Sequence, residues 1–174
     1  MSKEETQTYK RLKNKKQDNY PKYLIIHHTG GTDKNPLTDT SKHTAKDIER
    51  WHLSKGWEGL GYQYVAHKDG KVWKGRPEFY HGAHCSKYNK KSIGICMSGN
   101  FDLTLPTAKQ EASMKILIKD IQTRYPNIII KYHRDFARKS CPGNNIKKDW
   151  IKSLLEEEMI RVPKRILLEL KKYI

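Results

Sequence analysis

Two short apolar segments, far apart in the chain, each end in histidine. The first is Tyr23–His28 (YLIIHH) and the second is Ile128–His133 (IIIKYH). Runs of this length that are rich in β-branched and aromatic residues predict buried β-strands. The last side chains of such strands lie at the end of the sheet, where the sites of α/β proteins tend to form. We therefore expect a fold built around a sheet that carries these histidines at its strand ends.

A cysteine in the loop after the second segment completes a candidate metal site. Cys141 follows His133 with seven residues between them, inside the turn Lys139–Pro142 (KSCP). Because this stretch is polar, burial for packing is a poor explanation of the thiol. His27, His133 and Cys141 would make a three-ligand zinc site with its fourth position free for water, as in catalytic rather than structural sites. Spacing alone leaves open that His27 is a satisfied strand-end residue and His133 a surface residue.

The intervening segments predict alternating helices and strands. Two capping-box sequences, Thr44–Asp47 and Thr107–Gln110, each precede apolar residues at helical spacing. Tyr62–His67 and Lys71–Lys74, joined through Asp-Gly, predict a β-hairpin, and Ser92–Ser98 predicts a buried strand. The resulting order, β-α-β-β-β-α-β-loop-α, predicts an α/β fold with a mixed central β-sheet flanked by helices. The core face of the second helix is expected to consist of Met114, Leu117, Ile118, Ile121 and Tyr125.

The two ends of the chain are predicted to be appendages to one domain. Residues 1–20 are polar and basic, which predicts a flexible arm or a frayed helix. Residues 21–160 are expected to form the domain. Residues 161–174, in which Pro163 suits a first turn, predict a basic amphipathic C-terminal helix. Docking of this helix on the domain and its contact with a membrane or a partner protein are both compatible with the pattern.

Charge and cysteine content limit the partners and the compartment. The 174 residues include 35 Lys+Arg and 19 Asp+Glu, which gives a formal net charge of +16. This excess of positive charge predicts attraction to polyanions. It does not choose among nucleic acid, anionic wall polymers and anionic lipid. The cysteines Cys85, Cys96 and Cys141 are odd in number, which favours a reducing compartment over a disulfide framework. The N-terminus has no apolar segment of a secretory signal, and no run approaches the roughly 18 apolar residues of a membrane span. We therefore expect synthesis in the cytoplasm.

Several ordered motifs resemble one enzyme family. The motifs are Ile25–Thr29 (IIHHT), Trp57–Tyr64 (WEGLGYQY), His67–Val72 (HKDGKV), Tyr88–Cys96 (YNKKSIGIC), and His133–Asp135 (HRD) with the KSCP turn. Together they are similar to the zinc-dependent N-acetylmuramoyl-L-alanine amidases of the type-2 class. That class shares its fold with peptidoglycan recognition proteins and with the amidase lysozymes of bacteriophages. The resemblance runs from about residue 22 to 155.

The resemblance implies a role for each matching residue. His27, His133 and Cys141 match the zinc ligands; His28 is the rival of His27, but alternation sends the two side chains to opposite faces. Tyr62 matches a tyrosine that contacts the zinc-bound water or the developing oxyanion, and Lys139 a lysine that amidase activity needs in the phage branch. His84 lies where the family has a histidine near the substrate groove. The expected cofactor is Zn²⁺, and the expected reaction is cleavage of the amide between N-acetylmuramic acid and L-alanine in peptidoglycan.

The cellular role and the rival functions follow from the same features. We expect a monomeric phage or prophage endolysin that reaches the wall through a holin-type lesion, with the basic surface drawn to anionic wall or outer-membrane polymers. A non-catalytic peptidoglycan-binding module is one alternative, and Cys141 speaks against it because inactive members commonly lack that ligand. A phage amidase that also binds a polymerase is another. Nucleic acid is not an expected partner, since charge is the only feature that would support it.

Overall fold

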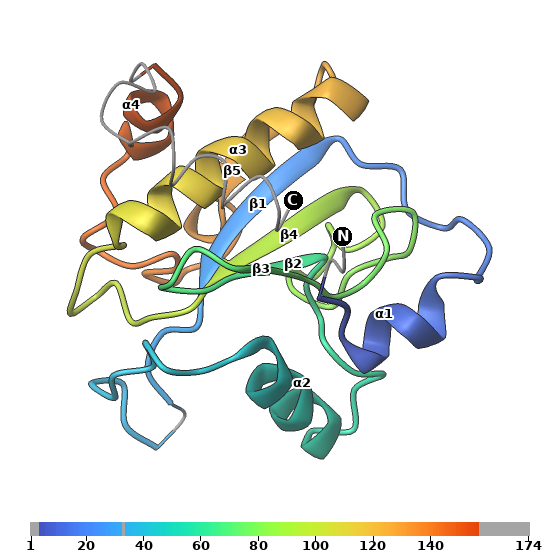
Figure 1. The fold of residues 1–174 in the computed structure, drawn as a ribbon, viewed down its shortest axis with the longest axis horizontal. Coiled ribbons are helices and arrows are strands. Elements are labelled where there is room, and N and C mark those ends of the chain that lie inside the picture. Colours follow the sequence, from blue (N-terminus) through green and yellow to red (C-terminus); the bar gives the residue numbers. More distant parts are fainter. Residues whose placement is uncertain (1–3, 33, 157–174) are drawn as a thin grey trace.

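A mixed β-sheet runs through the centre of the part of the chain that the computed structural model describes, residues 4–32 and 34–156 (Figure 1). The strand order within it is β3-β2-β4-β1-β5. The β1–β4, β1–β5 and β2–β4 pairs are parallel, and the β2–β3 hairpin is antiparallel. The predicted α/β class and mixed sheet are thus confirmed. The strands are β1 (Tyr23–His28), β2 (Tyr64–Ala66), β3 (Val72–Lys74), β4 (Ser92–Met97) and β5 (Ile129–Tyr132).

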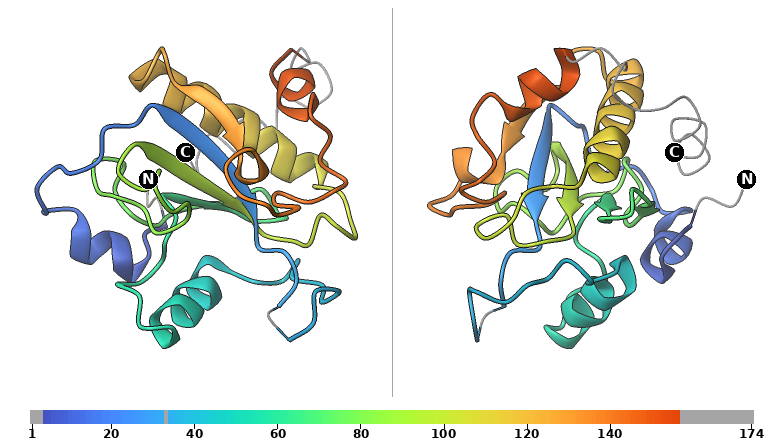
Figure 2. Two further views of the ribbon diagram at one scale, coloured as in Figure 1. Left: turned by 180° about the vertical axis from the view of Figure 1, so that it is seen from behind. Right: turned by 60° about the vertical axis from the view of Figure 1, so that its left-hand side comes forward.

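Helices cover the two faces of this sheet differently. On one face, Ile93, Ile95 and Met97 of β4 belong to the main core, together with buried residues of α3 (Ala108–Arg124). On the other face, Cys96 packs with Ala45 and Ile48 of α2 (Ala45–Ser54). Figures 1 and 2 show the sheet lying between α3 and α2. Because neighbouring strand residues point to opposite faces, His27 and Cys96 lie on the α2 side, whereas His28 lies on the α3 side, where its Nδ1 accepts from the backbone N–H of Phe101.

The two predicted helix starts are present, but only one is a full capping box. At α2, Thr44 and Asp47 cap each other reciprocally, as the sequence predicts. At α3, the hydroxyl of Thr107 accepts from the backbone N–H of Gln110. The side-chain amide of Gln110 turns inward instead and donates to the carbonyls of Ala66 and Ser98. Since Gln110 is fully buried, it satisfies sheet carbonyls that water cannot reach.

Of the two predictions for the N-terminal residues, a flexible arm or a frayed helix, the described residues show a helix that is packed on the domain. Residues 7–12 form a short helix, α1 (Gln7–Leu12), and Leu12 is fully buried. The backbone N–H and the hydroxyl of Thr8 both donate to the buried carboxylate of Glu49 on α2. The backbone N–H of Leu60 in turn donates to the Thr8 hydroxyl. The helix α1 therefore packs on the domain, and Thr8 supplies two of the donors that the buried carboxylate of Glu49 needs.

Trp150–Glu156 forms α4, and its Leu154 is buried against the α3 side of the core. The predicted basic helix of residues 161–174 lies outside the described residues. After β5, His133–Asp135 forms a short 3-10 turn, η1, that leads into the loop with Cys141.

Candidate metal centre and active site

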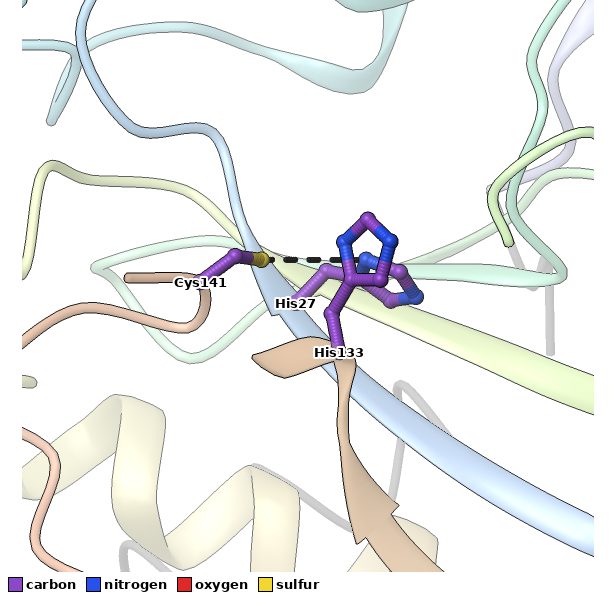
Figure 3. Close-up of side chains that lie close together, drawn as sticks. All are labelled: His27, His133 and Cys141. Atoms are coloured by element: carbon purple, nitrogen blue, oxygen red, sulfur yellow. Dashed lines mark hydrogen bonds between the residues drawn. The ribbon is translucent and has the colours of Figure 1, made fainter. Parts of the chain in front are cut away.

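Three side chains from separate segments meet at one end of the sheet. His27 lies near the end of β1, His133 follows the neighbouring parallel strand β5, and Cys141 lies in the loop beyond η1. The carboxyl ends of parallel strands meet at one edge, which is why the first two come together. Among the described residues, one ligand atom from each of these three side chains lies within 4.8 Å of the others. Figure 3 shows the imidazoles and the thiol pointing toward one another, with Cys141 Sγ 3.8 Å from His27 Nδ1.

A hydrogen-bonded loop holds Cys141 in this position. The hydroxyl of Ser140 donates to Asp102 at 2.8 Å, and the backbone N–H of Asn144 donates to the same carboxylate at 2.8 Å. The backbone N–H of Arg134 donates to the carbonyl of Cys141 at 2.8 Å. Its guanidinium donates to two carbonyls of the following turn at 3.0 and 2.6 Å. Asp102 was not predicted from the sequence, because only the folded chain brings it to this loop.

Without a bound cation, the three candidate donors are in their neutral forms. Burial lowers the pKa of His27 well below its usual value, and the neighbouring His84 lowers it further. Burial likewise lowers the pKa of His133 to about 4 and raises the pKa of the Cys141 thiol to about 12. Neutral imidazoles have a free lone pair for a metal, and a divalent cation offsets the cost of a buried thiolate. Two nitrogen donors and one sulfur donor therefore fit zinc.

Tyr62 and Lys139 flank these donors. The ring centroid of Tyr62 lies 5.2 Å from that of His27. Burial raises the pKa of Tyr62 well above its usual value, so the hydroxyl keeps its proton and acts as a donor. Lys139 lines a groove together with His133, and its charge also lowers the pKa of His133. The structure thus brings both predicted residues to the candidate site.

His84 lies directly against one of the candidate ligands. Its Nδ1 is 3.0 Å from Nε2 of His27. Burial, ahead of the charges of His133 and Arg76, lowers the pKa of His84 to about 3. The ring also lines the groove of Lys139, so the predicted contact with substrate stays a prediction. The contact with His27 was not predicted from the sequence.

Two hollows lie near the candidate site, one lined by His133 and the other by Tyr62. The first, the Lys139 groove, includes Trp57, His84, Tyr88, His133 and Lys139. Tyr62 itself lines the second, which passes along α2 and includes Thr29, His43, Ile48 and Trp51. Trp57 stacks on His52 with ring centroids 4.5 Å apart. It is nevertheless 42% exposed, so the ring also contributes open surface to the groove.

Comparison with known proteins places the chain in a family. Residues 17–144 match the profile of the N-acetylmuramoyl-L-alanine amidase family. The chain belongs to this amidase family. The matched range begins after α1, so the helix that docks on Glu49 lies outside the matched residues.

Individual relatives of this amidase-family chain come from phages, bacteria and insects. The endolysin of Enterobacteria phage T3 is 33% identical over 116 residues, which cover 63% of this chain and 76% of the phage protein. Peptidoglycan-recognition protein SC2 of Drosophila melanogaster is 35% identical over 136 residues, covering 74% of this chain and 71% of that protein. The structure of the N-acetylmuramoyl-L-alanine amidase LysC from Clostridium intestinale has a TM-score of 0.70 at 30% identity, over 81% of this chain and 89% of LysC. The expected amidase-like fold is thus confirmed.

In the described part, no helix combines the length and the apolar composition needed to cross a bilayer.

Proposed function

We propose that the protein is a zinc-dependent peptidoglycan amidase that cleaves the bond between N-acetylmuramic acid and L-alanine. The observation that carries the proposal is the complete set of donors, His27, His133 and Cys141, within 4.8 Å of one another and beside two hollows. Membership of the amidase family supports the reaction. The similarity to a phage endolysin supports the role in lysis.

The residues around the donors suit hydrolysis of an amide. When bound by His27, His133 and Cys141, zinc would lower the pKa of a water molecule and polarise the amide carbonyl. The ammonium of Lys139 would donate to the negative charge that develops on the carbonyl oxygen. The neutral hydroxyl of Tyr62 would donate a hydrogen bond that orients the water or the departing amine. In this scheme the Lys139 groove and the hollow along α2 hold the substrate on either side of the donors.

A test of the proposal combines metal content with the chemistry of the products. Wild-type protein is expected to contain one zinc ion per chain and to release free α-amino groups of L-alanine from purified peptidoglycan, without new reducing sugar ends. Cys141→Ala should lose both zinc and amine release, because two remaining donors hold the metal poorly. Cys96→Ala is the matched control for zinc content, since this buried thiol lies beside His27 in the β1–β4 register but outside the donor set.

The outcomes separate the proposal from its rivals. Full zinc content and full amine release in Cys141→Ala would refute the assignment of the donors. Peptidoglycan binding by the wild type without amine release would identify a non-catalytic recognition module. Inhibition of a polymerase together with amine release would identify an amidase that also binds a polymerase, whereas retardation of DNA without amine release would refute the amidase assignment.

We further propose that the protein acts on the wall after passing through a lesion in the inner membrane. Its similarity to phage endolysins supports this route. Expression in the cytoplasm should leave cells intact until chloroform permeabilises the membrane, and then the optical density of the culture should fall. Lysis at the same rate without permeabilisation would contradict the route.

A further inference from the structure

We propose that His84 is a positioning residue that fixes the tautomer of His27 and so presents Nδ1 of His27 to the metal. This inference rests on the metal centre proposed above. It assigns His84 a role in metal binding, which differs from the substrate contact suggested by its position in the sequence.

A chain of hydrogen bonds through Ser92 determines which ring nitrogen of His84 carries the proton. At its far end, the hydroxyl of Ser92 donates to the backbone carbonyl of Tyr88 at 2.7 Å, and a carbonyl can only accept. The oxygen of Ser92 is then left to accept from Nε2 of His84, which lies 3.4 Å away. With its proton on Nε2, His84 has a lone pair on Nδ1.

The acceptor nitrogen of His84 determines which nitrogen of His27 keeps its lone pair. Nδ1 of His84 lies 3.0 Å from Nε2 of His27, and as a lone pair it can only accept. His27 must therefore carry its proton on Nε2, which leaves the lone pair on Nδ1. Nδ1 is the nitrogen that faces Cys141 Sγ at 3.8 Å. A metal-binding histidine commonly donates its second ring nitrogen to a partner that fixes its tautomer, and here that partner is a second histidine.

The His84 ring fills space that two glycines leave open. An added Cβ at Gly94 on β4 would lie 2.7 Å from Cδ2 and Nε2 of His84, and one at Gly82 would lie 2.4 Å from Cδ2. Both positions are thus closed to larger residues unless the ring moves. The side-chain oxygen of Asn89 accepts from the backbone N–H groups of His84 and Cys85 at 2.9 Å, which holds the loop. The ring is therefore held between two glycines, on a braced backbone.

Zinc affinity of the purified protein, measured by competition with a chromophoric chelator, tests the inference without reference to activity. His84→Ala should bind zinc roughly 10- to 100-fold more weakly than wild type, the usual cost of losing such a partner. His84→Asn should recover most of that loss, because its side-chain oxygen can accept from Nε2 of His27. Gly94→Ala keeps every donor and acceptor but displaces the ring, so it should also weaken zinc binding.

The proton position can be read directly in the zinc-free protein. Nitrogen-15 NMR of the histidine rings should show His27 protonated on Nε2 in wild type and as a mixture of tautomers in His84→Ala. His81→Asn is the matched control, since His81 lies in the same loop but bonds to Asp18; it should leave zinc affinity and the His27 spectrum unchanged. Circular dichroism would confirm that each variant is folded.

The possible results distinguish this inference from the proposed function. If wild type binds zinc through the three donors but His84→Ala binds it equally tightly, the inference is wrong and the metal centre stands. An Nδ1-protonated His27 in wild type would also overturn it. A raised KM in His84→Ala with unchanged zinc affinity would instead show that His84 is a substrate contact. If wild type binds no zinc, the proposed function fails together with the inference.

Discussion

At the scale of single residues, the candidate site combines donors that burial keeps neutral with the cation Lys139 at the rim. Burial shifts the pKa values of His133 and Cys141 toward their uncharged forms. Lys139 is different, because it is exposed and lines the groove beside His133. A charged group at the mouth of a neutral site can act on substrate without disturbing the donors. This contrast predicts that metal binding and catalysis can be separated by substitution.

Lys139→Met should lower kcat about 10²- to 10³-fold, the typical effect of removing one donor to a developing oxyanion. Zinc content should not fall, because Lys139 is not a donor to the metal. Steady-state kinetics on a soluble muropeptide together with zinc analysis would check this. Arg138→Met is the control, since it removes the adjacent exposed cation, and it should retain activity. Loss of zinc in Lys139→Met would show that the residue supports the metal site instead.

At the scale of elements, α2 depends on its N-terminal cap. The hydroxyl and the backbone N–H of Thr44 donate to the carboxylate of Asp47 at 2.7 and 2.9 Å. The hydroxyl bond is the larger cause that lowers the pKa of Asp47 to about 2. Because α2 covers the sheet face that carries His27, and Ile48 lines the adjoining hollow, this cap also supports the wall of the candidate site.

Asp47→Ala should cost about 1 kcal/mol of unfolding free energy near neutral pH. The carboxylate is 35% exposed, so solvent screening keeps the effect below what the full pKa shift would give. The folded pKa lies below the unfolded value of about 3.9, so this stabilisation is complete above about pH 4 and is lost as the pH falls through 2.

Urea unfolding at about pH 6 and pH 2 would check the prediction, because the gap between Asp47→Ala and wild type should shrink at the lower pH. Arg50→Ala is the control, since it removes only the exposed ion-pair partner of Asp47 and should have little effect. An equal gap at both pH values would mean that the charge of Asp47 does not contribute.

Much of the fold and the donor set could be predicted because short-range patterns specify them. The apolar runs of β1, β4 and β5 and the stripe of α3 depend on periodicity alone, and the parallel strands then bring His27 and His133 together. The contacts of Asp102, His84 and Thr8 depend instead on loops that close over long sequence distances. No local pattern marks such a contact. The buried Leu12 shows the same limit, because no periodic apolar pattern in the polar, basic segment marks it as a residue that packs on the domain.

At the scale of the whole molecule, the net charge of +16 is far from neutral. Four exposed lysines lie on α1 and in the residues that follow it: Lys10, Lys13, Lys15 and Lys16. The helix α1 itself is packed on the domain. Deletion of residues 1–20 would therefore remove the buried Leu12 and the donors to Glu49. It would change the stability of the fold and the positive charge of the surface at the same time. Substitution of the exposed cations separates the two.

We expect that Lys→Gln substitution at these four positions reduces binding to cell walls and weakens its dependence on salt, because surface attraction to polyanions is screened by ions. Sedimentation with purified walls at increasing NaCl would measure both. The control replaces four other exposed lysines on the α3 and α4 side, which are Lys109, Lys119, Lys147 and Lys148. Equal losses in the two variants would attribute binding to net charge; a loss confined to the first would identify the α1 segment as the contact.

The separation of the candidate metal donors along the chain has a consequence for when the protein can work. His27 and Cys141 are 114 positions apart, and they meet only after β5 has paired with β1. A nascent chain that still lacks its last third therefore has no complete donor set. Zinc that binds only the finished sheet stabilises it by about 4 kcal/mol at a free concentration 1,000 times its Kd. Metal loading would then mark the end of folding and favour activity only in complete chains.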